Sequence, residues 1–121
     1  MPVKRILIVD DSPTERLALT ELLHKHGYHV FTSESGDEGV AKAKELLPDL
    51  ILMDVVMPGT NGFQATRALT RDEATKNIPV ILCTTKDQET DKVWGMRQGA
   101  MDYLTKPVDS AALIAKIAAI P

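Results

Sequence analysis

The chain has 121 residues, of which 44% are hydrophobic and 26% are charged, and its formal net charge at pH 7 is −3. This length and composition suit a single globular domain over residues 1–121 and exclude a disordered chain. The mild acidic excess argues against a nucleic-acid-binding protein, and the lone Cys83 excludes an internal disulfide. No apolar run approaches the roughly 20 residues that span a bilayer, so we expect a cytoplasmic protein without membrane insertion.

Short apolar runs alternate with helix-like segments along the whole chain. Residues 5–9 are apolar without alternation, which predicts a strand buried on both faces. The sequence Ser12-Pro13-Thr14-Glu15 predicts a helix start in which Ser12 and Glu15 form a capping box, and Gly27 predicts the end of that helix. Further strands are predicted at 28–32, 50–53, 78–83 and 102–105, and further helices at about 37–46, 63–70, 88–98 and 108–120.

This alternation predicts an α/β fold of the doubly wound (βα)5 kind, with a five-stranded parallel sheet covered by helices on both faces. Ligands of such sheets bind beyond the carboxyl ends of the strands. Polar residues stand at four of these ends: Asp10 and Asp11 after the first strand, Asp54 after the third, Thr84 after the fourth and Lys106 after the fifth. These side chains are therefore expected to converge at one edge of the sheet.

The residue types at this edge point to phosphoryl chemistry. Carboxylates held close together repel one another and are costly without a cation, and oxygen ligands with water suit Mg²⁺. A carboxylate beside Mg²⁺ can attack phosphorus and form an aspartyl phosphate. A lysine and the metal can spread the charge of the phosphoryl group, to which a hydroxyl can also hydrogen-bond.

Each residue taken alone also has a plainer interpretation. An Asp-Asp pair after a strand commonly caps a helix, Lys106 alone could be a solvated charge, and Thr84 could simply end its strand. Tyr103 and Trp94 could be packing residues, and Cys83 in a buried strand is expected to be an inert core thiol. The coincidence of several such residues at strand ends favours the functional interpretation.

Several motifs, taken in order, resemble one known family over essentially the whole chain. They are Ile6-Leu7-Ile8-Val9-Asp10-Asp11, Leu52-Met53-Asp54-Val55-Val56-Met57-Pro58 with Asn61-Gly62, Thr84, and Tyr103-Leu104-Thr105-Lys106-Pro107. Together they resemble the receiver domains of two-component response regulators, the CheY-like group. That resemblance implies a flavodoxin-like fold with strand order 2-1-3-4-5. Residues 84–95 and 62–67 are more closely similar to the regulators of pilus-driven twitching motility.

The resemblance also implies a role for each acid. Asp54 is the phosphoacceptor. Asp11 and Asp54 bind Mg²⁺ directly, together with the backbone carbonyl of Val56. Asp10 contributes mostly through water.

The same resemblance implies a switch beside the acids. Lys106 contacts the phosphoryl group, Thr84 closes onto it, and Tyr103 changes rotamer in response. The Lys106–Pro107 peptide bond is expected to be cis. Thr85 departs from the family pattern, because many relatives carry alanine there, and its bulk could narrow access to the phosphoryl group.

The implied function is that of a response regulator and not of an enzyme with a separate substrate. A histidine kinase is expected to supply the phosphoryl group. A downstream protein is expected to bind the face formed by the fourth helix, fifth strand and fifth helix. We expect a stand-alone receiver that acts in trans, with a fragment of a longer regulator or a phosphate sink as the alternatives.

Two other classes of protein conflict with particular residues. A phosphatase of the haloacid-dehalogenase type needs a second acid two residues after its nucleophile, and that position holds Val56. A flavodoxin-like nucleotide or flavin binder needs a phosphate cradle after the first strand, where Asp10 and Asp11 would repel a phosphate.

Overall fold

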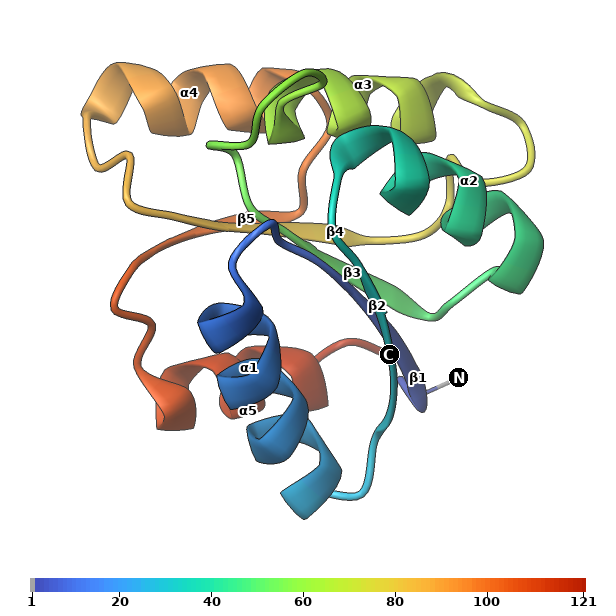
Figure 1. Ribbon diagram of the computed structural model, residues 1–121, viewed down its shortest axis with the longest axis vertical. Helices are drawn as coiled ribbons and strands as arrows, with labels where there is room; N and C mark the ends of the chain where they lie inside the picture. The colour runs from blue at the N-terminus through green and yellow to red at the C-terminus, as the bar shows by residue number, and fades with distance from the viewer. Residues whose placement is uncertain (1) are drawn as a thin grey trace.

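A five-stranded parallel sheet lies between two layers of helices in the computed structural model, which describes residues 2–121 (Figure 1). In chain order the elements are β1 (Arg5–Val9), α1 (Pro13–Lys25), β2 (His29–Ser33), α2 (Gly36–Leu46), β3 (Leu50–Met53), α3 (Gly62–Arg71), β4 (Val80–Thr84), α4 (Glu89–Arg97), β5 (Asp102–Thr105) and α5 (Ser110–Ala118). The strands stand in the order β2-β1-β3-β4-β5, and all neighbours are parallel. The predicted fold and strand order are confirmed.

Two hydrophobic clusters fill the spaces on either side of the sheet. Helices α1 and α5 cover one face, and α2, α3 and α4 cover the other (Figure 1). Within β1, Ile6 and Ile8 pack toward α1 and α5, whereas Leu7 and Val9 pack toward the opposite layer. This two-sided burial explains why the strand is apolar without alternation. Among the described residues, no helix is long and apolar enough to cross a membrane.

The fourth strand begins two residues later than predicted, and the cause is local. The N–H of Ile78 closes a turn onto the carbonyl of Thr75 at 3.0 Å, so this residue is not available to the sheet. Pro79 has no N–H to donate. The ladder therefore begins at Val80.

The helix starts depend on side-chain caps that the sequence pattern predicts only in part. Ser12 Oγ accepts the N–H of Glu15 at 3.3 Å, as predicted, but the N–H of Ser12 donates to Asp10 Oδ1 at 2.9 Å. The first hydrogen bond of the predicted capping box is confirmed, but the reciprocal one, from the N–H of Ser12 to the Glu15 side chain, is wrong. Helix α5 begins at Ser110, two residues later than predicted, because the Asp109 carboxylate accepts N–H groups from its first turn.

Helix α2 ends at a residue in a strained backbone conformation. Leu47 has φ 46° and ψ 61°, and it is 51% exposed. A residue with a Cβ atom is destabilised by roughly 1 kcal/mol in this left-handed region. Leu47→Gly is therefore expected to raise the free energy of unfolding by about 0.5–1 kcal/mol in urea denaturation. Leu47→Ala keeps the Cβ atom and should bring no gain, and a loss of stability in the glycine variant would contradict the prediction.

Candidate functional site

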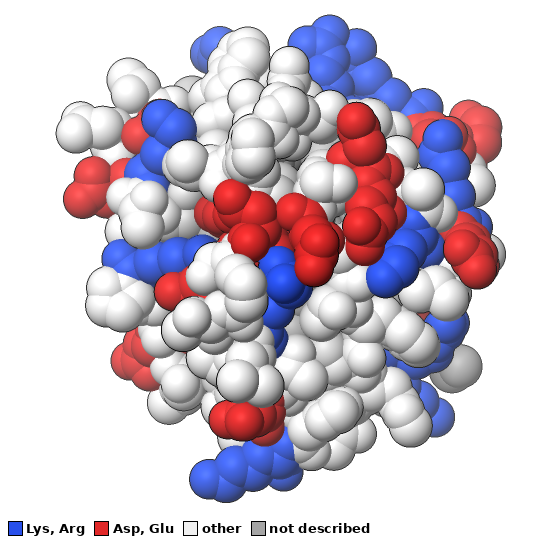
Figure 2. Space-filling model, in the orientation of Figure 1, with Lys and Arg blue, Asp and Glu red and all other residues white. Residues whose placement is uncertain are grey.

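The carboxyl ends of four strands meet at one edge of the sheet and carry the predicted site residues. Asp10 follows β1, Asp54 follows β3, Thr84 ends β4, and Lys106 follows β5. Carboxylate oxygens of Asp10, Asp11 and Asp54 lie within 4.8 Å of one another. Figure 2 shows acidic side chains in the middle of the face, where β1 leads into α1 in Figure 1, with a basic side chain beside them. The structure thus brings the three acids together as predicted.

Asp10 is held by hydrogen bonds from every side. Its N–H donates to the carbonyl of Ser33 at 3.1 Å, and its own carbonyl accepts from Arg16 Nη1 at 2.7 Å. Oδ1 accepts the N–H of Ser12 at 2.9 Å, and Oδ2 accepts from Lys106 Nζ at 2.8 Å. A buried carboxylate with these partners has a fixed direction, so Asp10 forms the rigid side of the site.

Asp54 lies at the centre of the edge and is also buried. Its N–H extends the sheet to the carbonyl of Val9 at 2.9 Å, and its Oδ1 accepts the N–H of Val55 at 2.8 Å. Burial raises the pKa of Asp54 to about 6; the charge of Lys106 opposes this effect, and the charge of Asp10 adds to it. A cation beside Asp54 would favour its ionised form, which is the nucleophilic one.

Lys106 is the ammonium that faces these acids. Its Nζ lies 2.8 Å from Asp10 Oδ2, 3.8 Å from Asp54 Oδ1 and 4.0 Å from Glu15 Oε2. Burial by itself lowers the pKa of Lys106, but the hydrogen bond to Asp10 and the charges of Asp54, Asp10 and Glu15 outweigh it, so the pKa is raised. The Lys106–Pro107 bond is cis, as the resemblance implies. Lys106 therefore stays charged within reach of Asp54.

The donor set fits a hard divalent cation. The carboxylates of Asp10, Asp11 and Asp54 offer only oxygen ligands, and Lys106 supplies a single positive charge among them. Asp11 is exposed, and within residues 2–121 its carboxylate accepts no hydrogen bond, so it is available to a metal ion. Val56, whose carbonyl the resemblance adds to the ligands, lies in the loop two residues after Asp54. The cluster could hold Mg²⁺.

The loop after Asp54 folds back tightly beneath the site. The N–H of Gly62 donates to the carbonyl of Val55 at 3.0 Å. A Cβ atom on Gly62 would overlap the carbonyl oxygen of Asp54 and lie 2.7 Å from the Cα of Val55. Helix α3 is capped at the same point by a reciprocal pair, Asn61 and Gln64, with both bonds at 2.9 Å. This capping box was not predicted, although the Asn-x-x-Gln spacing is the signal for one.

Thr84 and Tyr103 meet at the loop that follows β4 and are not hydrogen-bonded to the acids in the described chain. The buried Thr84 Oγ1 accepts the N–H of Lys86 at 3.3 Å, and the Tyr103 hydroxyl donates to the carbonyl of Lys86 at 2.7 Å. Burial raises the pKa of Tyr103 to about 12, helped by the charges of Asp91, Asp87 and Asp54. Both predicted switch residues are therefore hydrogen-bonded to the backbone of Lys86, Thr84 to its N–H and Tyr103 to its carbonyl.

Two neighbours of the site were missed at the level of sequence. Glu15 lies beside Lys106, and Arg16 bonds the carbonyl of Asp10. Both belong to the first turn of α1, whose start is fixed by Ser12 directly after the acids. A helix capped at a strand end points its first-turn side chains at that edge, and this is the signal that could have found them.

Comparison with known proteins gives consistent matches. The model of the family described as the response regulator receiver domain matches residues 6–118. The chain is 65% identical over 116 residues to Protein PilH of Pseudomonas aeruginosa, which covers 96% of both proteins. It is 42% identical to the response regulator PleD of Caulobacter vibrioides and 40% identical to the phosphate regulon regulator PhoB of P. aeruginosa. These two matches cover 93% and 97% of this chain, but only 25% of PleD and 51% of PhoB.

Solved structures agree with the observed topology. The chemotaxis protein CheY4 of Vibrio cholerae has a TM-score of 0.88 at 32% identity, with coverage of 95% of this chain and 96% of that one. The complex of CheX, CheY, BeF3 and Mg from Borrelia burgdorferi gives a TM-score of 0.88 at 27% identity, covering 94% of this chain and 86% of that one. The CheY-like fold implied by the motifs is confirmed.

Proposed function

The chain belongs to the response regulator receiver domain family, and from this premise we propose that it accepts a phosphoryl group from a histidine kinase on Asp54. The observation that carries the proposal is the convergence of Asp10, Asp11 and Asp54 with Lys106 at one sheet edge. In this proposal the protein is a phosphoacceptor that assists its own phosphorylation and dephosphorylation. It is not an enzyme with a separate substrate.

The chemistry follows from the positions of Asp54 and Lys106. The Asp54 carboxylate attacks the phosphorus of a phosphohistidine in line, so that an oxygen–phosphorus bond forms as the phosphorus–nitrogen bond breaks. The electron pair of the broken bond stays with the imidazole, which takes up a proton. Lys106 Nζ, already 3.8 Å from Asp54 Oδ1, neutralises charge on the phosphoryl oxygens.

The acids divide into direct and indirect metal ligands in this proposal. Asp11, Asp54 and the carbonyl of Val56 would bind Mg²⁺ directly, and Asp10 would do so through water. When bound, the ion supplies positive charge for the phosphoryl oxygens. Asp10 meanwhile keeps Lys106 at the site through its 2.8 Å hydrogen bond.

Phosphorylation would be transmitted through the loop after β4. The phosphoryl group carries up to about two negative charges and replaces the single charge of the Asp54 carboxylate, so the negative charge beside Lys106 grows by about one. The Thr84 hydroxyl then donates to a phosphoryl oxygen and ceases to accept the N–H of Lys86. Because the Tyr103 hydroxyl holds the carbonyl of Lys86, a movement of this loop also moves Tyr103. The two arrangements form an equilibrium that phosphorylation shifts.

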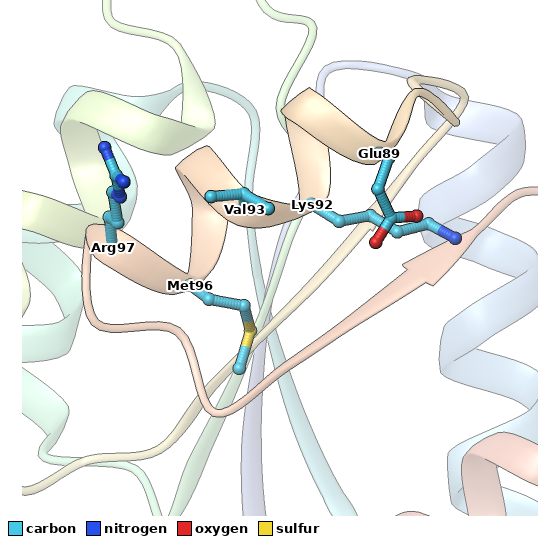
Figure 3. A pocket seen from close by; sticks show the side chains of 5 residues that line it. All are labelled: Glu89, Lys92, Val93, Met96 and Arg97. Atoms are coloured by element: carbon cyan, nitrogen blue, oxygen red, sulfur yellow. The ribbon is translucent and has the colours of Figure 1, made fainter.

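The surface that signals would include the outer face of α4 together with β5 and α5. Val93, Trp94 and Met96 on α4 are each between 46% and 48% exposed, so Trp94 is not a core residue. Figure 3 shows Val93 and Met96 between charged side chains toward each end of the helix. They border a pocket of about 400 Å³ whose lining residues are Glu89, Lys92, Val93, Met96 and Arg97. Such a mixed surface suits a downstream protein partner.

The cellular role in this proposal is control of pilus-driven or chemotaxis-like motility from the cytoplasm. The 65% identity to PilH supports this assignment. The chain would act either as an effector that binds a target or as a sink that draws phosphoryl groups from a shared kinase.

Direct labelling tests the proposal. The protein is incubated with acetyl phosphate, or with autophosphorylated histidine kinases, in Mg²⁺, and mass spectrometry locates the modification. The expected result is one phosphoryl group on the peptide that contains Asp54, with no label when the metal is chelated. Absence of label with every donor in saturating Mg²⁺ would contradict the proposal.

A further inference from the structure

We propose that Arg16 is a positioning residue for the metal site, because its guanidinium holds the peptide group between Asp10 and Asp11 and so sets the direction of Asp11. The inference rests on the proposed phosphoacceptor function and extends it to a residue outside the acids and the switch. Arg16 is the fourth residue of α1 and lies directly behind the end of β1.

The contacts of Arg16 are unequal, and the shorter one is to the backbone. Nη1 donates to the carbonyl of Asp10 at 2.7 Å, whereas Nη2 lies 3.3 Å from Glu34 Oε1. The Arg16 side chain is 15% exposed, but that of Glu34 is 72% exposed. Because surface ion pairs contribute little, the hydrogen bond to the buried carbonyl is the stronger constraint.

The carbonyl of Asp10 depends on this donor. The parallel pairing of β1 with both of its neighbours ends at Val9, whose carbonyl accepts the N–H of Asp54. Asp10 itself is buried, and one residue beyond the ladder Arg16 supplies the hydrogen bond that a strand would otherwise give. Without Arg16 the carbonyl would remain unpaired or would rotate toward water.

A rotation of this carbonyl would displace Asp11. The peptide group is planar, so the direction of the Asp10 carbonyl also fixes the following N–H and the Cα of Asp11. No hydrogen bond within residues 2–121 holds the Asp11 carboxylate. Its place within 4.8 Å of Asp10 and Asp54 therefore comes from its backbone, which Arg16 constrains.

The positive charge of Arg16 and its hydrogen bond to Asp10 would have opposite effects on the affinity for Mg²⁺. A guanidinium near a cation site repels the cation, so by charge alone its removal would tighten Mg²⁺ binding. Loss of a positioning contact would weaken Mg²⁺ binding. A residue that only stabilises the fold would leave the Mg²⁺ affinity of the folded protein unchanged. The sign of the change in affinity therefore separates the three roles.

Calorimetric titration of the full chain with Mg²⁺ provides the measurement. Arg16→Met keeps the apolar stem and loses the donors, and we expect its dissociation constant to rise by about tenfold or more. Arg16→Lys keeps the charge without the planar fork and should be intermediate. Glu34→Gln removes only the ion pair and is the matched control, with an affinity close to that of the unchanged protein. If Arg16→Met does not fold, the weakening in Arg16→Lys carries the comparison.

Amide hydrogen exchange without metal gives an independent readout. The N–H of Ser12, which donates to Asp10 Oδ1, should exchange faster in Arg16→Met than in Glu34→Gln. Equal or tighter Mg²⁺ binding together with unchanged exchange would overturn the inference. If the unchanged protein binds no Mg²⁺ and takes no label, the proposed function fails, and the exchange comparison still decides whether Arg16 holds the peptide group.

Discussion

Asp54→Asn is expected to abolish phosphoryl transfer to the chain while leaving it folded. The amide has nearly the shape of the carboxylate, and its oxygen can still accept the N–H of Val55. It is not an anionic nucleophile, however, so the yield of acyl phosphate should fall by several orders of magnitude. Burial raises the pKa of Asp54, which means that its ionised form is costly in the folded protein. Removal of this charge therefore limits any loss of stability. Labelling with acetyl phosphate and far-ultraviolet circular dichroism measure the two outcomes.

Asp102→Asn is the matched control for this variant. Asp102 begins β5 at the opposite end of the strand from the site, and it accepts a hydrogen bond from Lys116 Nζ at 2.7 Å. Its loss should affect stability modestly and labelling not at all. Retention of one phosphoryl group by Asp54→Asn would show that a different residue is the acceptor.

Gly62→Ala is expected to destabilise the fold by about 3 kcal/mol or more, because the added methyl group overlaps backbone atoms. The overlap involves the carbonyl of Asp54 and the Cα of Val55, so relief requires movement of the acceptor's own backbone. Folded Gly62→Ala protein should therefore also label more slowly. Urea denaturation and the rate of acetyl phosphate labelling provide the measurements.

Gly59→Ala is the control within the same loop. Gly59 has φ 74°, and no heavy atom lies within 4 Å of an added Cβ. Its substitution is expected to cost only the strain of the left-handed backbone, roughly 1 kcal/mol. A loss of stability in Gly62→Ala no greater than in Gly59→Ala would show that the loop can relax away from β3.

The positions of the acids could be predicted because they depend on the sheet alone. An apolar run marks each central strand, and parallel strands place their carboxyl ends together, so Asp10 and Asp54 had to be neighbours once the fold was right. The partners of polar side chains follow a different logic. Lys106 was expected to contact the phosphoryl group, and without one it pairs at 2.8 Å with Asp10. That choice depends on competing distances, which a sequence does not contain.

The partner of Arg16 could not be predicted from the sequence either. The cap at Ser12 places Arg16 near the strand end, but an arginine in the first turn of a helix is usually solvated, so the cap alone does not identify the Asp10 carbonyl as its partner. The Thr84 hydroxyl was placed at the correct strand end, but its acceptor bond from Lys86 depends on the path of the next loop. Local turns likewise decided where β4 and α5 begin, because single caps and a proline outweighed the apolar pattern.

The bond between Lys106 and Asp10 has a consequence for the way the molecule assembles. The three acids lie in the first 54 residues, whereas their counter-ion arrives 52 residues after Asp54, beyond the last strand. During synthesis, the earlier strands therefore leave the ribosome with mutually repelling acids and without the ammonium of Lys106. Docking of β5 at the edge of the sheet brings one ammonium to the three acids and offsets part of this repulsion, which couples the maturation of the pocket to the docking of the last strand.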